Sequence, residues 1–168
     1  SLVGYTNAGK SSLFNRLTGA ENYTADQLFA TLDPTMRRLQ LPGKMSIILA
    51  DTVGFIRNLP HDLIAAFKST LEEVVTANLL IHVVDYANPA HLDQLQRVNT
   101  VLADLGADSN PQILVYNKID LMGQAPQIAR GQNGHISKVW LSAKTGDGLE
   151  LLLAALVEYF NQQQGVYQ

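Results

Sequence analysis

One stretch near the start of the chain has the residue types and spacing that hold a phosphate group. Residues 4–11 read Gly-Tyr-Thr-Asn-Ala-Gly-Lys-Ser and fit the pattern G-x-x-x-x-G-K-[ST] at every fixed position. Backbone N–H groups in such a loop surround a multiply charged phosphate, and a side chain at Gly4 or Gly9 would block that approach. The helix expected near Lys10 adds its positive dipole end. We predict that Lys10 reaches the β- and γ-phosphates of a nucleotide and that Ser11 ligates Mg²⁺.

A carboxylate at the end of an apolar segment supplies a second candidate for the metal. Asp51 follows Met45–Ala50 and precedes Thr52-Val53-Gly54. Taken alone, this segment is an ordinary turn at a strand end. Beside a phosphate loop, Asp51 can hold Mg²⁺ through water and the N–H of Gly54 can contact the γ-phosphate. Loss of that phosphate would release the following segment, as nucleotide switches do.

A hydroxyl between these two motifs would complete the Mg²⁺ ligands. The segment Phe29–Thr35 contains two hydroxyl residues, Thr31 and Thr35. Both are chemically able to ligate the metal, and spacing alone leaves the choice open. A turn set by Asp33-Pro34 is the structural alternative for the same segment.

Two short polar segments have the chemistry that recognises guanine. Asp120, at the end of Asn117-Lys118-Ile119-Asp120, can accept hydrogen bonds from N1–H and N2–H₂ of guanine. Adenine lacks both donors and would leave the carboxylate unpaired, at a cost of about 1–3 kcal/mol. Asn117 can brace the loop and contact the base, while the stem of Lys118 covers its face. In Ser142-Ala143-Lys144, the N–H of Ala143 can bond O6. Each segment follows a predicted strand, where ligands bind in open α/β sheets.

The elements that must position these residues alternate between strands and helices, which is typical of an α/β fold. Short apolar runs predict six strands in a mostly parallel sheet with helices on both faces. The predicted strands are residues 1–3, 36–41, 45–50, 79–84, 112–116 and 138–141. Helices are predicted after Lys10, between Asn88-Pro89 as the capped start and Gly106 as the stop, and over the apolar stripe from Leu149 to Phe160. We predict a surface loop with one short helix over residues 122–134.

Composition narrows the class of protein. The chain has 168 residues, 46% of them hydrophobic and 16% charged, as in one soluble domain. It has no cysteine, which excludes disulfides and thiolate metal sites and agrees with a reducing, cytoplasmic location. No apolar run approaches the roughly 20 residues of a transmembrane segment. A net charge of −3 gives no general attraction for DNA, and the basic cluster of Arg37, Arg38 and Lys44 is small.

The start of the chain suggests that residues 1–168 are a single domain taken from a larger protein. Only Ser1-Leu2-Val3 precede Gly4. A strand usually has about five or six residues, so we expect the first strand to be clipped.

Four segments together resemble a known family. The chain is similar to the translation-factor-related P-loop GTPases of the Obg–HflX group, and in particular to the G domain of HflX-type, ribosome-associated GTPases. The segments that carry the resemblance are residues 4–11, 28–35, 51–57 and, most specific to the family, 59–73. The chain departs from the family at Ser12 and Met36, where threonine is common, and neither position has an assigned role.

The resemblance implies a Ras-like G domain that binds GTP or GDP with Mg²⁺ and hydrolyses GTP. It selects Thr31 over Thr35 as the Mg²⁺ ligand of switch one, residues 26–36, and makes residues 51–70 switch two. It implies a further N-terminal domain and a ribosome partner, chiefly the large subunit, with a role in splitting or rescuing ribosomes under stress. We also expect a monomer.

These assignments give complete residue sets. The catalytic residues are Lys10, Ser11, Thr31 and Gly54, and the metal ligands are Ser11, Thr31 and, through water, Asp51. The predicted nucleotide-binding residues are Gly4, Tyr5, Thr6, Asn7, Ala8, Gly9, Lys10, Ser11, Phe29, Ala30, Thr31, Leu32, Asp33, Asp51, Thr52, Val53, Gly54, Asn117, Lys118, Ile119, Asp120, Ser142, Ala143 and Lys144.

The step of hydrolysis is the least supported by the residues. Ras-like switches place a glutamine after the Asp-x-x-Gly segment to orient water, whereas this chain has Phe55, which has no hydrogen-bonding group. We therefore expect slow intrinsic turnover that a partner or a cation accelerates, by roughly 10³–10⁵ for an added cationic group. Asn7 is a candidate K⁺ ligand, with bracing of the loop as its alternative role. A non-hydrolysing guanine-nucleotide module and a small-molecule kinase or ATPase are the rival functions.

Two histidines and three arginines lie near these motifs without a catalytic assignment. We expect His61 to cap a helix after switch two and His82 to be a hydrogen-bonded core residue. Arg37, Arg38 and Arg57 are expected to be solvated surface residues, with contact to ribosomal RNA as the alternative.

Overall fold

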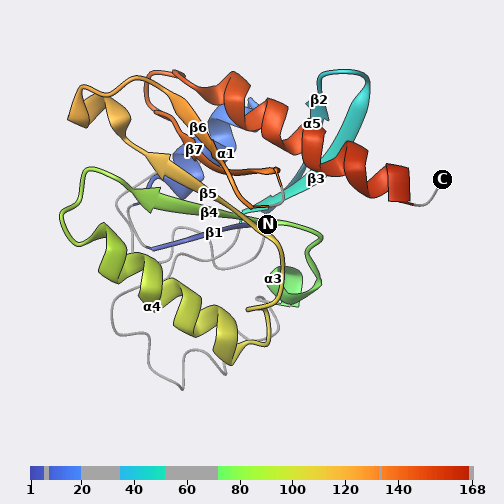
Figure 1. The fold of residues 1–168 in the computed structure, drawn as a ribbon, viewed down its shortest axis with the longest axis horizontal. Helices are drawn as coiled ribbons and strands as arrows, with labels where there is room; N and C mark the ends of the chain where they lie inside the picture. Colours follow the sequence, from blue (N-terminus) through green and yellow to red (C-terminus); the bar gives the residue numbers. More distant parts are fainter. Residues whose placement is uncertain (6–7, 20–34, 52–71, 133, 167–168) are drawn as a thin grey trace.

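Strands with buried faces form one seven-stranded sheet in the order β2-β3-β1-β4-β5-β7-β6 (Figure 1). The structure is a computed structural model that describes residues 1–5, 8–19, 35–51, 72–132 and 134–166. The five inner strands are parallel, and the two edge strands, β2 and β6, run antiparallel to their neighbours. The strands are β1 (Leu2–Gly4), β2 (Thr35–Leu41), β3 (Met45–Asp51), β4 (Leu80–Asp85), β5 (Gln112–Asn117), β6 (Gln127–Arg130) and β7 (Ile136–Trp140).

The prediction of six strands misses β6. This strand lies inside residues 122–134, which the sequence predicts as a loop with one short helix; the short 3₁₀ helix η1 (Ile119–Met122) comes just before it. Its side chains are largely exposed and show no regular alternation. β6 forms because β7 offers it a free edge, with Gln127 opposite Trp140 and Ile128 opposite Val139. The strand is stabilised by its pairing with β7, so the residues of β6 alone do not predict it.

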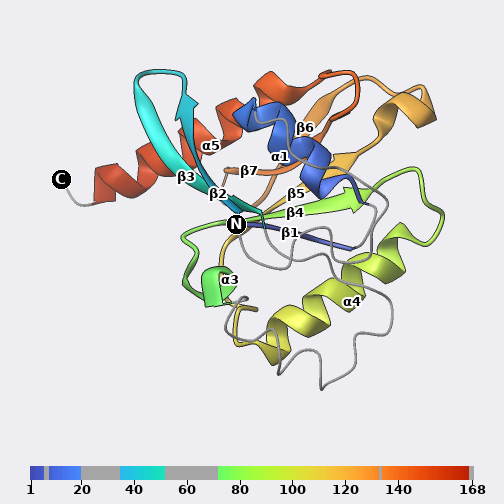
Figure 2. The same ribbon diagram turned by 180° about the vertical axis from the view of Figure 1, so that it is seen from behind.

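Helices cover both faces of the sheet, as predicted. The helices are α1 (Lys10–Thr18), α3 (Glu72–Thr76), α4 (His91–Asp104) and α5 (Leu149–Val166). On one face, Leu13 and Phe14 of α1 and Leu152 of α5 share a core with Leu2. On the other, Val98 and Leu102 of α4 pack with Val3, and Figure 2 shows the same two layers from behind. Alternate residues of β1 thus enter opposite cores, which fixes the register of the strand that leads to the phosphate loop.

The predicted end of α4 is confirmed, whereas its predicted start is not. Asn88-Pro89 does not cap the helix: Asn88 accepts the N–H of Ala90 on its side-chain oxygen at 2.9 Å, and the helix begins only at His91. The capping geometry therefore belongs to a turn before the helix. Gly106 stops the helix as predicted, with φ of +78° and the N–H of Ala107 bonded to the Leu102 carbonyl at 2.8 Å.

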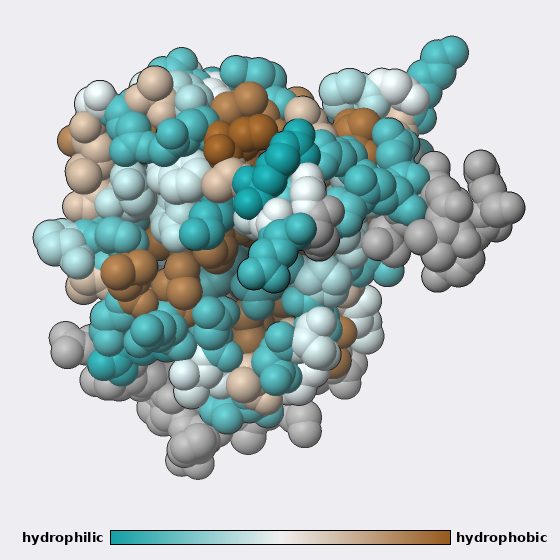
Figure 3. All heavy atoms as spheres, in the orientation of Figure 1, coloured by the Kyte–Doolittle hydropathy of each residue, from teal (hydrophilic) through white to brown (hydrophobic). Residues whose placement is uncertain are grey.

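The surface seen in Figure 3 is mainly hydrophilic, with hydrophobic residues in separate small areas. Within the described residues, none of the helices combines the length and apolar character that crossing a membrane requires.

Candidate functional site

Parallel strands bring the predicted motifs to one edge of the sheet. β1 ends at Gly4, β3 at Asp51 and β5 at Asn117, and Ser142 follows the end of β7 by two residues. Because these strands are parallel neighbours, the loops that leave them meet at the same edge. The structure therefore brings the phosphate loop, Asp51 and both base-reading segments together.

Gly9 allows the phosphate loop to pack against the base-reading segment. Its φ is +93°, in the left-handed region, and a Cβ there would lie 2.1 Å from Nδ2 of Asn117. A Cβ at Gly4 would lie 2.7 Å from the Val83 carbonyl oxygen. The sequence predicts these glycines from phosphate approach alone. The structure adds a second reason, which is close contact with the protein itself.

The charged groups of the phosphate end pair with one another. The ammonium of Lys10 forms an ion pair with Oδ1 of Asp51, and the hydroxyl of Ser11 donates to Oδ2 at 3.1 Å. Lys10 and Asp51 are only 6% and 4% exposed. Burial lowers the pKa of Lys10, and attraction to Asp51 opposes that shift. Three residues predicted to hold phosphate and metal thus form one cluster, in which Lys10 and Asp51 are buried and Ser11 is half-buried.

The donor set of this cluster suits Mg²⁺. A hydroxyl oxygen and a carboxylate are hard oxygen ligands, and both lie beside the loop that would hold the phosphates. The described residues contain no group of three or more His, Cys, Asp or Glu able to enclose a metal. These residues alone therefore supply only part of a magnesium shell, as expected for an ion that also binds nucleotide phosphates and waters.

Asn117 joins three motifs through its side-chain amide. Its Nδ2 donates to the Ala8 carbonyl at 2.9 Å, and its Oδ1 accepts the N–H of Ala143 at 2.9 Å. The residue is 3% exposed, so both bonds are shielded from water. The bracing role predicted for Asn117 is present here. The N–H of Ala143, predicted to bond guanine O6, is bonded to Asn117 in this conformation, so O6 would have to share it.

Asp120 is held in place by its neighbour from the other base-reading segment. The Ser142 hydroxyl donates to Oδ1 of Asp120 at 2.8 Å and accepts the N–H of Thr145 at 3.2 Å. Asp120 is exposed, and no hydrogen bond to its Oδ2 is found within the described part of the chain. One carboxylate oxygen of this exposed residue is thus fixed by the protein.

Sequence reasoning missed two residues of this site. Asp85, at the end of β4, accepts from Nζ of Lys118 at 3.0 Å and orients that side chain. Its position at a strand end beside β5 was the available signal. Arg16 of α1 donates to carbonyl groups of the Ser142–Lys144 segment. No local pattern marks it, because its partners are 127 and 128 residues away.

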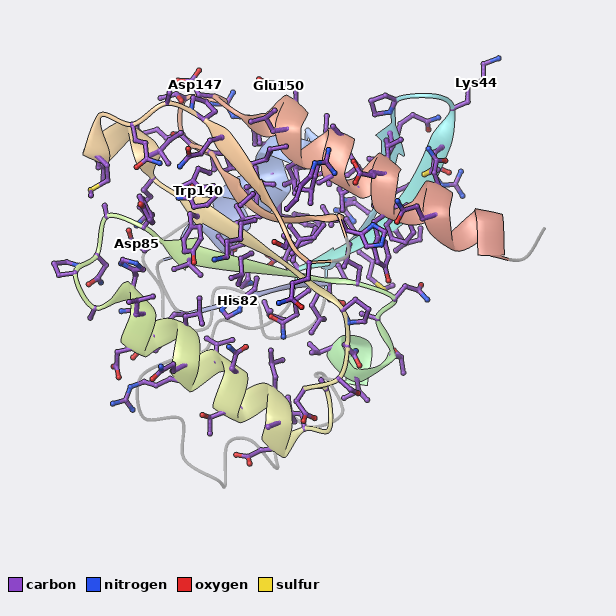
Figure 4. All side chains as sticks on the ribbon, viewed as in Figure 1. Lys44, His82, Asp85, Trp140, Asp147 and Glu150 are labelled. Carbon is purple, nitrogen blue, oxygen red and sulfur yellow. The ribbon has the colours of Figure 1, made fainter. Side chains whose placement is uncertain are left out.

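His82 lies in the core and is confirmed as a structural residue. It is 1% exposed on β4, and Figure 4 shows it well away from Asp85 at the strand end. Burial lowers its pKa to about 4, and a hydrogen bond with the Gln112 side chain partly offsets this. The histidine is therefore neutral at pH 7.

A further group of predicted residues lies outside the described residues. These are Thr6, Asn7, Phe29, Ala30, Thr31, Leu32, Asp33, Thr52, Val53 and Gly54, together with Phe55, Arg57 and His61.

Fold and site together define a P-loop guanine-nucleotide-binding domain. The family model described as "50S ribosome-binding GTPase" matches residues 1–118. The chain therefore belongs to this GTPase family, and the resemblance to HflX-type GTPases is confirmed by its curated relatives. It is 55% identical to GTPase HflX of Escherichia coli (strain K12) over 94% of this chain and 37% of the relative. It is 54% identical to GTPase HflX of Caldanaerobacter subterraneus subsp. tengcongensis over 93% of this chain and 35% of the relative.

A solved structure agrees with this assignment. The chain is similar to the crystal structure of a GTP-binding protein from Sulfolobus solfataricus in complex with GDP, with a TM-score of 0.74 and 29% identity. The alignment covers 96% of this chain and 52% of the other. The chain thus spans a little over a third of the curated relatives quoted above and about half of this structural neighbour.

Proposed function

We propose that this domain is a GTPase switch that binds GTP or GDP with Mg²⁺ and hydrolyses GTP. The observation that carries the proposal is the Asn117 amide, which bonds the phosphate loop on one side and the Ala143 segment on the other. A site built this way holds a phosphate group and a base at a fixed separation. With Asp120 beside it, the base that fits is guanine rather than adenine.

At the phosphate end, nucleotide binding would reorganise the buried cluster. The ammonium of Lys10 would turn from Asp51 to the β- and γ-phosphates. Ser11 would ligate Mg²⁺ directly and Asp51 would hold it through water, with Thr31 as the predicted switch-one ligand. When bound, the metal ion would neutralise negative charge on the phosphates. Lys10 and Ser11 therefore carry the chemistry that the described residues contribute.

At the base end, Asp120 needs little reorganisation, whereas the Ala143 N–H, bonded to Asn117, would have to be shared with guanine O6. Ser142 holds Oδ1 of Asp120, and the two oxygens together would accept N1–H and N2–H₂ of guanine. Lys118, bonded to Asp85 at 3.0 Å, lies where its stem would cover the base. Guanine specificity thus comes from groups that are already placed.

Hydrolysis is proposed to depend on a partner. Gly54 and Thr31 would sense the γ-phosphate, and Phe55 supplies no group to orient water. A positioned cation, from a partner or from K⁺ beside Asn7, would stabilise the charge of the transferring phosphoryl group.

The proposed partner is the ribosome, chiefly its large subunit, which would recognise the conformation of switches one and two. The protein is proposed to act as a monomer in the cytoplasm. The matching family's description, which names 50S binding, supports this partner. A role in splitting or rescuing ribosomes under stress extends the same proposal.

Single-turnover hydrolysis tests both the proposed GTPase activity and the proposed ribosomal partner. The 168-residue chain, loaded with GTP and Mg²⁺, is followed with and without purified large subunits, in K⁺ and in Na⁺. We expect slow hydrolysis that large subunits accelerate at least tenfold. Tight GTP binding with no hydrolysis in any condition would instead identify a non-hydrolysing module. Equal rates in K⁺ and Na⁺ would exclude the role of Asn7 in binding K⁺.

A further inference from the structure

Arg16 forms a bridge between the phosphate-binding helix and the Ala143 segment. It lies in the last turn of α1, the helix that begins with Lys10 and Ser11. Its Nε donates to the Ala143 carbonyl at 3.0 Å, and its Nη2 donates to the Lys144 carbonyl. One edge of the guanidinium therefore holds two consecutive carbonyl groups, a geometry that the planar fork of arginine suits.

The bridge completes a set of bonds that immobilises the backbone around Ala143. Asn117 accepts the N–H of Ala143 and thereby fixes the peptide group before this residue. Arg16 fixes the two peptide groups after it. The Ser142 carbonyl accepts the N–H of Gly146 at 2.9 Å, which closes the turn. Each peptide group from Ser142 to Lys144 therefore forms at least one hydrogen bond. Within the described part of the chain, Arg16 is the only residue that bonds the carbonyl oxygens of Ala143 and Lys144.

The turn is shaped to accept the guanidinium. Gly146 has φ of +87°, and a Cβ built there would lie 3.6 Å from Cζ of Arg16. The guanidinium therefore packs directly against this turn. Arg16 forms no ion pair with a carboxylate among the described residues, so its cation is directed to backbone carbonyls. Charge-assisted hydrogen bonds of this kind are stronger than neutral ones.

We propose that Arg16 is a positioning residue for guanine selectivity, acting through the backbone of Ala143. This inference rests on the proposed guanine-nucleotide binding. O6 of guanine accepts a hydrogen bond from the Ala143 N–H, whereas adenine presents an amino group there and is rejected. That rejection requires the N–H to keep its direction. Arg16 fixes this direction from α1, so the phosphate-binding helix and the selective N–H move as one unit.

The test compares three nucleotides on three variants of the 168-residue chain. Displacement of a fluorescent GDP analogue measures the affinities for GDP, IDP and ADP. GDP and IDP both present O6 and differ in the 2-amino group that Asp120 recognises; ADP lacks O6. Arg16→Gln removes the paired donors, and Arg16→Lys keeps the charge without the fork. Arg130→Gln is the control, since Arg130 on β6 also donates to a carbonyl, that of Gly134 at 2.7 Å, and pairs with Glu158. Arg130 lies opposite Ile136, at the end of β7 away from Ser142.

We expect Arg16→Gln to weaken GDP binding roughly tenfold and to lower the GDP-over-ADP ratio severalfold, while the GDP-over-IDP ratio changes less than about twofold. The affinities and ratios of Arg16→Lys should lie between those of the unmodified chain and those of Arg16→Gln. Arg130→Gln should leave all ratios unchanged. KM should rise more than turnover at saturating GTP falls, because the bonds of Arg16 are to the Ala143 and Lys144 carbonyl groups.

Two results would overturn the inference. One is an equal loss of affinity for all three nucleotides, which is what general damage to the phosphate loop would produce. The other is no change in any ratio in a variant whose circular dichroism shows it folded. If Arg16→Gln fails to fold, the ratios of Arg16→Lys decide. Failure of the unmodified chain to bind GDP would instead refute the proposed function.

Discussion

The two ends of the site are built from different interactions. At the phosphate end, Lys10 and Asp51 are buried opposite charges that pair with each other. At the base end, the neutral amide of Asn117 bonds two backbone groups. The first arrangement is satisfied without a nucleotide, but its groups would have to exchange partners when one binds. The second is satisfied with or without one.

This difference assigns separate tasks to the two ends. Groups that must exchange partners can report which phosphates are present, because their interactions differ between ligand states. Groups that stay fixed provide selectivity without a cost of rearrangement. We therefore propose that the phosphate end acts as the switch and that the base end stays fixed beside it.

Removing one charge of the phosphate end should have the largest effect. Lys10→Met removes the ammonium that pairs with the buried carboxylate of Asp51 and should lower the free energy of unfolding of the ligand-free chain by about 3–5 kcal/mol. Urea unfolding measures this loss. Lys10→Met/Asp51→Asn, which removes both charges, should recover a large part of it.

The base-end counterpart, Asn117→Ala, leaves two neutral groups unbonded and should cost only about 2 kcal/mol. If Lys10→Met costs no more than Asn117→Ala, the contrast between a charged and a neutral end is wrong.

Acid should lower the stability of the chain by protonating His82, which is buried in the core on β4. Its pKa in the folded chain is about 4, against 6.5 for an ordinary histidine, so the unfolded chain binds the extra proton first. Stability from this residue is fully present above pH 6.5 and is lost as the pH falls towards 4, by up to about 3 kcal/mol. Urea unfolding of the unmodified chain and of His82→Asn across this range measures the difference in slope. Parallel curves would show that His82 does not titrate as described.

Changing the base-reading carboxylate should have a smaller effect, confined to specificity. Asp120→Asn can no longer accept both N1–H and N2–H₂ of guanine, and its amide can donate to the O2 of xanthine. We expect GDP binding to weaken roughly tenfold and XDP binding to strengthen, with stability nearly unchanged because Asp120 is exposed. Displacement assays with GDP and XDP measure this. A comparable loss for both nucleotides would mean that Asp120 supports the loop and does not read the base.

The sequence predicts the site better than it predicts the connections between motifs. The phosphate loop, Asp51 and Asn117–Asp120 are recognisable because their chemistry requires fixed residue types at fixed spacing. β6 is not, because its stability comes from pairing with β7. The bonds of Asn117 to Ala8 and Ala143 span 109 and 26 residues, and such partners follow only from the order of the strands. Arg16 was missed for the same reason, whereas Asp85 was missed although its position at a strand end marks it.

The central claim is that this site selects guanine nucleotides. Displacement of a bound fluorescent GDP analogue by GDP and by ADP, in the presence of Mg²⁺, tests it most directly. The fixed Asp120 and Ala143 predict that ADP displaces the analogue only at concentrations roughly 100-fold higher or more, since it loses two or more hydrogen bonds. Displacement by GDP and ADP at equal concentrations would contradict the account.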